Sequence, residues 1–154
     1  MFGIKTKVVI IAATLALGGF LYVGEAMVEP AAAGTVTVWK SPTCGCCTDW
    51  VAHMRGAGFT VVVHDVDDMQ TVKQTHGVPP PMQSCHTAEV GGYVLEGHVP
   101  AEAVNRMLAE RPRAKGLAVP GMPQGSPGME TGRKDPYDVV LFGNPTGNTV
   151  YERR

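Results

Sequence analysis

The stretch that decides the fold is TVTVWKSPTCGCC, residues 35–47. Its β-branched and aromatic start predicts a strand over Thr35–Trp39. Ser41-Pro42-Thr43 favours a turn, and three cysteines follow within the next four residues. A helix ending near Gly56 is then expected, because apolar residues recur at i, i+1 and i+4 on one face: Trp50, Val51 and Met54. A strand, a turn with three cysteines and a helix thus come in succession.

Short elements continue the alternation downstream. TVVVH, at Thr60–His64, predicts a second strand. Asp68 is a favourable N-cap for a short helix through Thr75, and Gly77 ends that helix. The prolines at 79–81 exclude a helix interior or a central strand at that point.

A hairpin and a third helix are expected next. Met82–Thr87 and Gly92–Glu96 are interpreted as two short strands joined by a turn. Pro100 is expected to start a helix through Glu110, because proline is favoured in the first turn. The predicted apolar face of this helix carries Val104, Met107 and Leu108.

The C-terminal part is predicted to contain a long loop and a terminal hairpin. Residues Arg111–Pro136 are rich in Gly and Pro and show no periodicity. Tyr137–Phe142 predicts a last strand, with which Val150-Tyr151 is expected to pair across the turn at Asn144–Asn148. The preceding order β-α-β-α-β-β-α predicts an α/β fold, specifically a thioredoxin-like sandwich with these two C-terminal additions.

Residues 1–33 are interpreted as a targeting segment and not as part of the fold. Lys5 and Lys7 precede an apolar run at residues 8–24, and the small-residue pattern Ala31-Ala32-Ala33 follows. These features indicate either a cleaved signal peptide or a retained membrane anchor. Both alternatives place one domain, residues 34–154, on the far side of the inner membrane. If the cell is a Gram-negative bacterium, this compartment is the oxidising periplasm. Membrane contact is expected only through the N-terminal segment.

The charge balance narrows the choice of partners. Lys and Arg total 13, Asp and Glu total 14, and the net charge is −1. Nucleic acid is therefore not expected as a partner, because a nucleic-acid-binding domain usually presents a strongly basic face. All four cysteines and all five histidines lie after residue 33. The predicted domain thus contains every thiol and every imidazole of the chain.

The cysteine pattern indicates thiolate chemistry. Cys44 and Cys47 have the C-x-x-C spacing of a thioredoxin-type dithiol. They lie at a predicted helix N-terminus, where unpaired backbone N–H groups and the helix dipole favour thiolates. Cys46 is a third sulfur at the same turn, which disulfide exchange does not need and which suits a soft cation, above all Cu(I). Cys85, on the strand expected after the prolines, is predicted to approach this turn as a fourth sulfur.

Two other uses of the four cysteines stay open. Two structural disulfides would stabilise an exported domain, although three cysteines within four residues make a poor framework for them. A structural zinc site with four thiolates is the stronger alternative, although zinc ligands usually come as two separated pairs.

Histidine and methionine side chains are additional candidate ligands or neighbours of a metal. His98 precedes a helix and is either such a neighbour or an ordinary loop histidine. His86 follows Cys85, but strand alternation would point it to the opposite face. Met122 and Met129 lie in the Gly- and Pro-rich loop. They would bring thioethers to a Cu(I) site if this loop covers the cysteine turn, and would otherwise only anchor the loop.

Several motifs together resemble one bacterial family: VWKSPTCGCC at 38–47, SCHTA at 84–88, EGHVP at 96–100, GLAVPGMP at 116–123 and GSPGME at 125–130. The chain is similar over residues 35–142 to the CopG-like copper-resistance family, an exported family formerly catalogued as a domain of unknown function. The resemblance implies a periplasmic thioredoxin-like fold, copper binding and a role in copper tolerance. It also implies that the thiolate ligands are Cys44, Cys46, Cys47 and Cys85.

The sequence therefore predicts a periplasmic copper-resistance protein that binds Cu(I) through four cysteine thiolates. Thiolate sulfur readily bridges soft metals, so a site with several copper ions is expected, together with Cu(I)/Cu(II) redox handling that would make the protein a copper oxidoreductase. Copper ions are the expected partners, with other periplasmic copper-handling proteins or an electron-transfer partner. The alternatives are a thiol–disulfide oxidoreductase using Cys44 and Cys47 and a structural zinc-binding module.

Overall fold

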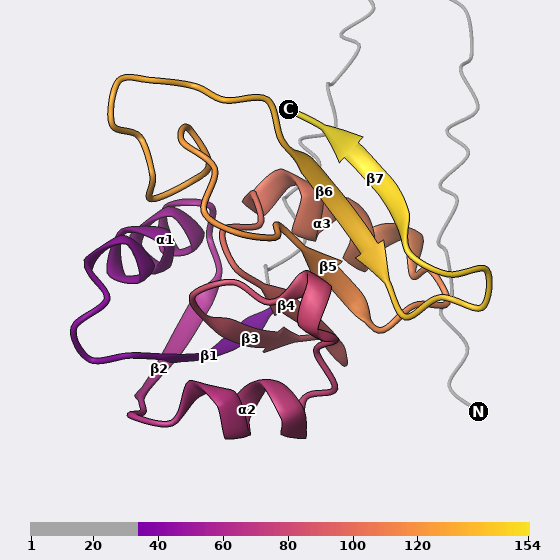
Figure 1. Ribbon diagram of the computed structural model, residues 1–154, viewed down its shortest axis with the longest axis horizontal. Coiled ribbons are helices and arrows are strands. Elements are labelled where there is room, and N and C mark those ends of the chain that lie inside the picture. Colours follow the sequence, from indigo (N-terminus) through magenta and orange to yellow (C-terminus); the bar gives the residue numbers. More distant parts are fainter. Residues whose placement is uncertain (1–33) are drawn as a thin grey trace, which may run out of the picture.

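A single mixed sheet organises the part of the chain that the computed structural model describes, residues 34–154 (Figure 1). Its seven strands lie in the order β2-β1-β3-β4-β5-β6-β7. The strands are β1 Thr35–Lys40, β2 Thr60–Asp65, β3 Thr87–Val90, β4 Tyr93–Glu96, β5 Gly116–Ala118, β6 Asp138–Phe142 and β7 Thr149–Arg153. The helices are α1 Gly45–Gly56, α2 Met69–Thr75, the 3₁₀ turn η1 Pro80–Met82 and α3 Ala101–Glu110.

The strand directions follow from the lengths of the connections. β1 and β2 are parallel because α1 crosses between them, and β4 and β5 are parallel because α3 does the same. The β3–β4 and β6–β7 pairs are antiparallel hairpins, and β3 also runs antiparallel to β1. The turn from β1 into α1 and the segment that enters β3 therefore meet at one end of the sheet.

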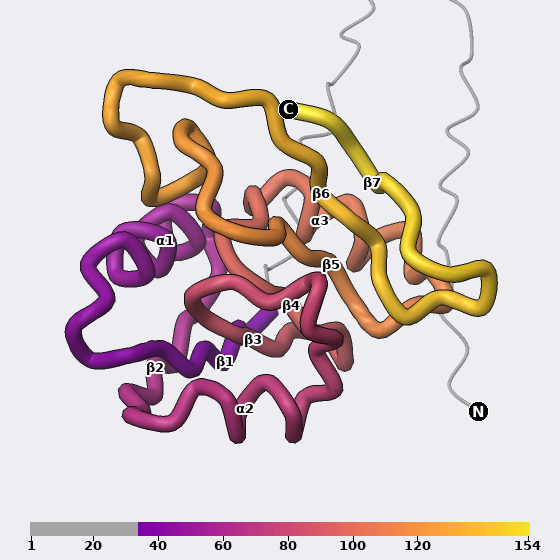
Figure 2. The backbone as a smooth tube through the Cα atoms, in the orientation of Figure 1, coloured from indigo at the N-terminus to yellow at the C-terminus, as the bar shows by residue number. Residues whose placement is uncertain are grey.

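The two faces of the sheet are covered by different elements. Trp50 of α1 and Met107 of α3 pack with Leu95 and Leu117 in the main core, so both helices lie on one face. The alternate strand positions, such as Val94, pack on the other face in a smaller cluster with Val78, Ala118 and Phe142. Figure 2 shows α2 on the side of β1 and β3 away from α1.

Most of the predicted elements are confirmed, and two predictions are wrong. The segment predicted as a strand over Met82–Thr87 enters the sheet only at Thr87, because η1 occupies the proline run and residues 83–86 are irregular. The predicted loop Arg111–Pro136 contains the strand β5. That strand is only three residues long, so it leaves no period-2 pattern, although all three residues are buried.

The predicted signal peptide or anchor, residues 1–33, lies outside the described residues. Among residues 34–154, no helix combines the length and the apolar character that crossing a membrane requires.

Candidate metal centre

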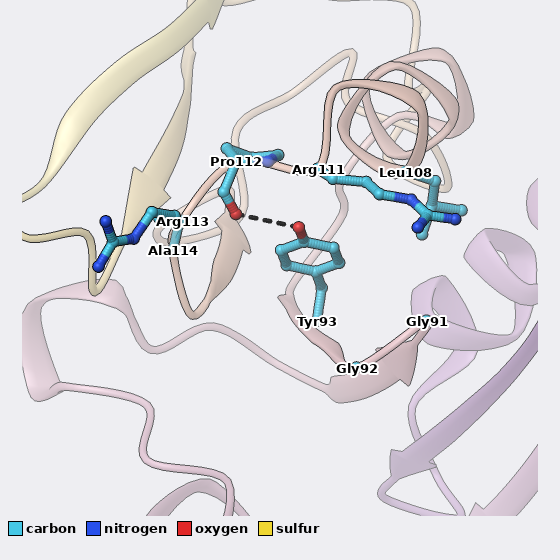
Figure 3. Close-up of a pocket in the computed structure, with 8 residues that line it drawn as sticks. All are labelled: Gly91, Gly92, Tyr93, Leu108, Arg111, Pro112, Arg113 and Ala114. Atoms are coloured by element: carbon cyan, nitrogen blue, oxygen red, sulfur yellow. Dashed lines mark hydrogen bonds between the residues drawn. The ribbon is translucent and has the colours of Figure 1, made fainter. Parts of the chain in front are cut away.

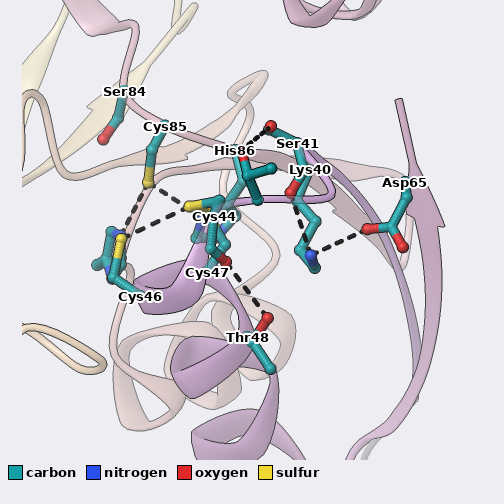
Figure 4. The surroundings of a disulfide bond; sticks show 12 residues. Lys40, Ser41, Cys44, Cys46, Cys47, Thr48, Asp65, Ser84, Cys85 and His86 are labelled. Atoms are coloured by element: carbon teal, nitrogen blue, oxygen red, sulfur yellow. Dashed lines mark hydrogen bonds and ion pairs between the residues drawn. A yellow bond between two sulfur atoms is a disulfide. The ribbon is translucent and has the colours of Figure 1, made fainter. Parts of the chain in front are cut away.

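The cysteine turn, residues 41–47, joins β1 to α1. Its backbone closes through the Cys44 N–H, which donates to the carbonyl of Ser41 at 3.1 Å. Cys44 is the residue preceding α1, and Cys46 and Cys47 lie in the first turn of the helix. Cys44 and Cys47 are joined by a disulfide, while Cys46 is a free thiol whose Sγ lies 3.5 Å from that of Cys44. Three sulfur atoms therefore lie together at this helix N-terminus (Figure 4).

A fourth sulfur reaches the turn from the Cys85 segment, residues 83–86, which precedes β3. The Sγ atoms of Cys44, Cys46, Cys47 and Cys85 all lie within 4.8 Å of one another, and we call this group the sulfur cluster. Figure 4 shows Cys85 facing the turn from a different part of the chain. The predicted approach of Cys85 is thus confirmed, although the residue lies in an irregular segment and not on a strand.

Two imidazoles lie beside Cys85. His98 Nε2 is 2.8 Å from Cys85 Sγ, and His86 Nδ1 is 3.4 Å from the same atom. The prediction that His86 points to the opposite face is wrong, because strand alternation does not apply to the irregular residues before Thr87. His86 instead packs against the Trp50 ring in the interior. Cys85, His86 and His98 form a second group able to hold a metal ion.

Burial sets the protonation of these groups. Desolvation lowers the pKa of His98 and lowers that of His86 well below its ordinary value, so both rings are neutral near pH 7. His98 Nδ1 donates to the carbonyl of Pro127 at 2.6 Å, which leaves the Nε2 lone pair facing Cys85. Burial, reinforced by the nearby Cys46, raises the pKa of the Cys85 thiol to about 11. The Cys85 thiol is therefore protonated near neutral pH, and a metal ion that binds there would release its proton.

The loop at residues 119–137 covers one side of the cysteine turn. A Cβ atom at Gly128 would lie 2.6 Å from the carbonyl oxygen of Cys46, so the loop backbone rests directly on the start of α1. The Glu130 carboxylate accepts the Gly128 N–H at 2.7 Å and shapes the loop there. Met122 is 53% exposed and Met129 is half-buried. Of the two alternatives that the sequence left open, the loop thus covers the cysteine turn, while ligation by Met122 and Met129 stays a prediction.

A buried pair of charged residues behind the Cys85 segment was not recognised from the sequence. Glu96 and Lys73 are 0% and 5% exposed and form an ion pair of 2.6 Å directly behind the Cys85 segment. The one available signal was the charge of Glu96 at the end of an otherwise apolar strand. The role of His53 was also not recognised from the sequence: its Nε2 accepts the Ala101 N–H at 3.0 Å and links α1 to α3.

A pocket of about 570 Å³ lies away from the sulfur cluster (Figure 3). It is lined by the β3–β4 turn at Gly91 and Gly92 and by residues 111–114, so it lies at the other end of β3 from Cys85. Tyr93 donates across it to the carbonyl of Pro112 at 2.9 Å. Its lining contains no cysteine or histidine and takes no part in the metal centre.

The fold and the sulfur cluster define an α/β domain whose cysteines are able to bind a soft metal ion. A family model described as "Protein of unknown function, DUF411" matches residues 82–129, and no curated protein matches. Two solved structures of a copper resistance protein CopG, described as form 1 and form 2, are each 44% identical to the chain. They cover 79% and 78% of this chain and 98% and 97% of their own, with TM-scores of 0.74 and 0.73. The chain belongs to the CopG-like copper-resistance family.

Proposed function

We propose that this protein binds Cu(I) through the thiolates of Cys44, Cys46, Cys47 and Cys85 and changes the oxidation state of copper. The observation that carries the proposal is the gathering of four sulfur atoms within 4.8 Å of one another at a partly exposed turn. Thiolates favour Cu(I), and one thiolate sulfur bridges two ions readily, so a site for several ions is proposed. His86 and His98 supply neutral nitrogen donors beside Cys85.

The Cys44–Cys47 disulfide supports a redox role. Binding through all four thiolates requires reduction of this bond by two electrons. In the reverse direction, the two thiols release two electrons and two protons as the disulfide forms, and two Cu(II) ions each accept one electron to become Cu(I). The same residues would therefore both bind copper and exchange electrons with it. An electron-transfer partner, or another copper-handling protein, would then restore the starting state.

We also propose a thioredoxin-like assignment and a periplasmic location. The element order β-α-β-α-β-β-α and the strand order β2-β1-β3-β4, with β1 and β2 parallel, support the first. The family membership, together with residues 1–33 as a signal or anchor, supports the second.

Copper loading of purified protein tests the proposal. The protein is reduced, loaded with Cu(I) without oxygen and measured for metal per chain, with zinc offered as competitor. We expect several copper ions per chain, retained against a strong Cu(I) chelator, and a large loss of copper in Cys46→Ser. Thr43→Ser is the matched control, because it changes an exposed residue of the same turn. Full copper retention by Cys46→Ser would exclude Cys46 as a ligand, and preferential retention of zinc would indicate the structural zinc module.

A thiol–disulfide oxidoreductase is the second candidate, because Cys44 and Cys47 already form a C-x-x-C disulfide at a helix N-terminus. It predicts insulin reduction by copper-free protein, and this activity would survive Cys46→Ser. Weak copper binding combined with such activity would favour this candidate over the copper proposal.

A further inference from the structure

The Cys85 segment lies over a three-residue floor, Glu96-Gly97-His98, at the end of β4. The Gly97 N–H donates to the carbonyl of His86 at 2.9 Å. Glu96 contacts one side of the segment through its carboxylate, and His98 contacts Cys85 itself through Nε2 at 2.8 Å. Each of the three floor residues thus makes a direct contact with the Cys85 segment. In the sequence, the EGHVP motif at 96–100 indicated a role only for its histidine.

The Glu96 carboxylate is the centre of a buried polar network. Oε1 accepts the backbone N–H of Ser84 at 2.6 Å, and Oε2 accepts the Thr87 hydroxyl at 2.6 Å. Lys73 Nζ, from α2, completes the network 2.6 Å from Oε1. Ser84 and Thr87 flank Cys85 and His86 in the sequence, so one carboxylate holds both ends of the dipeptide that carries the metal-ligating side chains.

Gly97 brings the floor close to the segment. Its φ of +71° is in the left-handed region that glycine adopts readily. A Cβ atom there would lie 2.5 Å from Ser84 Oγ and 2.8 Å from the carbonyl oxygen of Val119. The Ser84 hydroxyl in turn donates to the carbonyl of Gly121, which connects the segment to the loop at residues 119–137. The segment therefore packs closely against the end of β4 and is hydrogen-bonded there to the Glu96 carboxylate.

We propose that Glu96 is a positioning residue for copper, which holds Cys85 in place to complete the sulfur cluster through its hydrogen bond to the Ser84 backbone. This inference rests on the proposed copper-binding function. Lys73 has a supporting role, because it neutralises a carboxylate that is fully buried. Comparison with an apolar side chain shows why the hydrogen-bond acceptor matters for position. A buried ion pair is often replaced by apolar residues at no cost in stability, but an apolar side chain cannot accept the Ser84 N–H.

Two double variants separate positioning from stability. Lys73→Met/Glu96→Gln removes both charges but keeps an amide oxygen to accept the Ser84 N–H and an amide N–H to donate to Thr87. Lys73→Met/Glu96→Leu removes both charges and the acceptor, with a side chain of similar size. Both proteins are compared in their urea unfolding midpoints, so that any difference in global stability is measured separately.

Alkylation of Cys85 is the readout that does not depend on copper. In a Cys46→Ser background with the Cys44–Cys47 disulfide intact, Cys85 is the single free thiol of the chain. We expect N-ethylmaleimide to label Cys85 at least tenfold faster in the Leu variant, while the Gln variant stays within threefold of the Cys46→Ser parent. With Cys46 present, we expect the apparent Cu(I) affinity, measured against a chelator, to fall ten- to a hundredfold in the Leu variant. The Gln variant is expected to keep most of the affinity of the unsubstituted protein.

A second pair of variants leaves the Lys73–Glu96 ion pair intact, and it decides the question if the Leu variant does not fold. Both substitutions remove the Ser84 hydroxyl. Ser84→Pro also removes the backbone N–H that donates to Glu96, whereas Ser84→Ala keeps it. Gln83 has φ −64° and ψ 140°, which suits a residue before proline. We expect at least tenfold faster labelling of Cys85 in Ser84→Pro and less than threefold in Ser84→Ala.

Equal labelling in the Gln and Leu variants, or equal labelling in Ser84→Pro and Ser84→Ala, would overturn the positioning role. So would a Leu variant with faster labelling but unchanged Cu(I) affinity. If the unsubstituted protein itself fails to retain Cu(I), the proposed copper function fails and the role for copper fails with it. The labelling rates would still report separately whether Glu96 holds Cys85.

Discussion

The cysteine turn and the Cys85 segment supply sulfur to the same cluster, but the structure builds them in different ways. The turn is formed by residues close together in the sequence: β1 ends, the Cys44 N–H donates to the carbonyl of Ser41, and α1 begins at Gly45. The Cys85 segment has no regular structure of its own. Its position depends on Glu96, twelve residues away from Ser84 in the chain, and on the loop that contacts Ser84 at Gly121.

The two parts of the cluster therefore differ in what positions their sulfur atoms: local structure in the cysteine turn, and residues distant in the chain for Cys85. Helix formation alone gathers three sulfur atoms, so the turn is expected to keep its shape when distant residues change. The fourth sulfur joins them only when α2, β4 and the Gly- and Pro-rich loop are all in place. The completeness of the cluster is thus expected to be the most sensitive property of the site.

Removing one partner of the buried ion pair gives the largest expected effect. Glu96→Ala leaves Lys73 buried without a counter-charge and leaves the Ser84 N–H and the Thr87 hydroxyl without their acceptor. We expect a loss of about 3–5 kcal/mol in the free energy of unfolding, measured by urea denaturation.

The matched control for this variant is an exposed ion pair. Glu102→Ala breaks the contact with Arg154, in which the Glu102 side chain is 69% exposed, and is expected to cost less than about 1 kcal/mol. Equal costs for the two substitutions would show that the Cys85 segment does not depend on a buried network.

The same distinction explains what the sequence could predict. Periodicity, capping residues and turn residues located β1, α1, β2 and α2, and the C-x-C-C spacing located three sulfur atoms of the cluster, because all of these are local signals. The sequence also indicated that Cys85 approaches the turn. It did not indicate that His86 faces the site or that Glu96 lies behind the segment. Both depend on the register of β3 against β4, which pairs Thr87 with Glu96. The strand β5 was missed for a related reason, since three buried residues between β4 and β6 carry no pattern of their own.

Filling the space beneath the segment is the next largest change. Gly97→Ala forces a left-handed backbone on alanine and places a Cβ against Ser84 and Val119. We expect a loss of about 2–4 kcal/mol in urea denaturation, from backbone strain and overpacking together. Unfolding is measured with the Cys44–Cys47 disulfide intact. A stability within about 0.5 kcal/mol of the original protein would mean that the segment moves freely, against the rigid contact proposed here.

The raised pKa of Cys85 gives a chemical measure of the same packing. Alkylation requires the thiolate, so a thiol with a pKa of about 11 should react roughly a hundredfold faster at pH 10 than at pH 8. An ordinary thiol, with a pKa of about 8.5, should gain only about fourfold over the same range. The measurement uses metal-free protein with peptide mapping to identify Cys85, and circular dichroism confirms that the protein is folded at pH 10. The same labelling of urea-unfolded protein is the control, and a fourfold gain in the folded protein would contradict the burial of this thiol.

The smallest effect is expected in the cysteine turn, whose shape depends on local structure. Gly45 lies between two cysteines, yet a Cβ atom there would meet nothing within 4 Å, and its φ lies outside the left-handed region. Alanine at this first position of α1 restricts the unfolded chain without a cost in the folded one. Gly45→Ala should therefore raise the free energy of unfolding by about 0.5–1 kcal/mol in urea denaturation of the oxidised protein. Two glycines of the same site, Gly45 and Gly97, would then respond to the same substitution with opposite signs. A loss of stability at Gly45 would instead show that the cysteine turn, like the Cys85 segment, depends on contacts from distant parts of the chain.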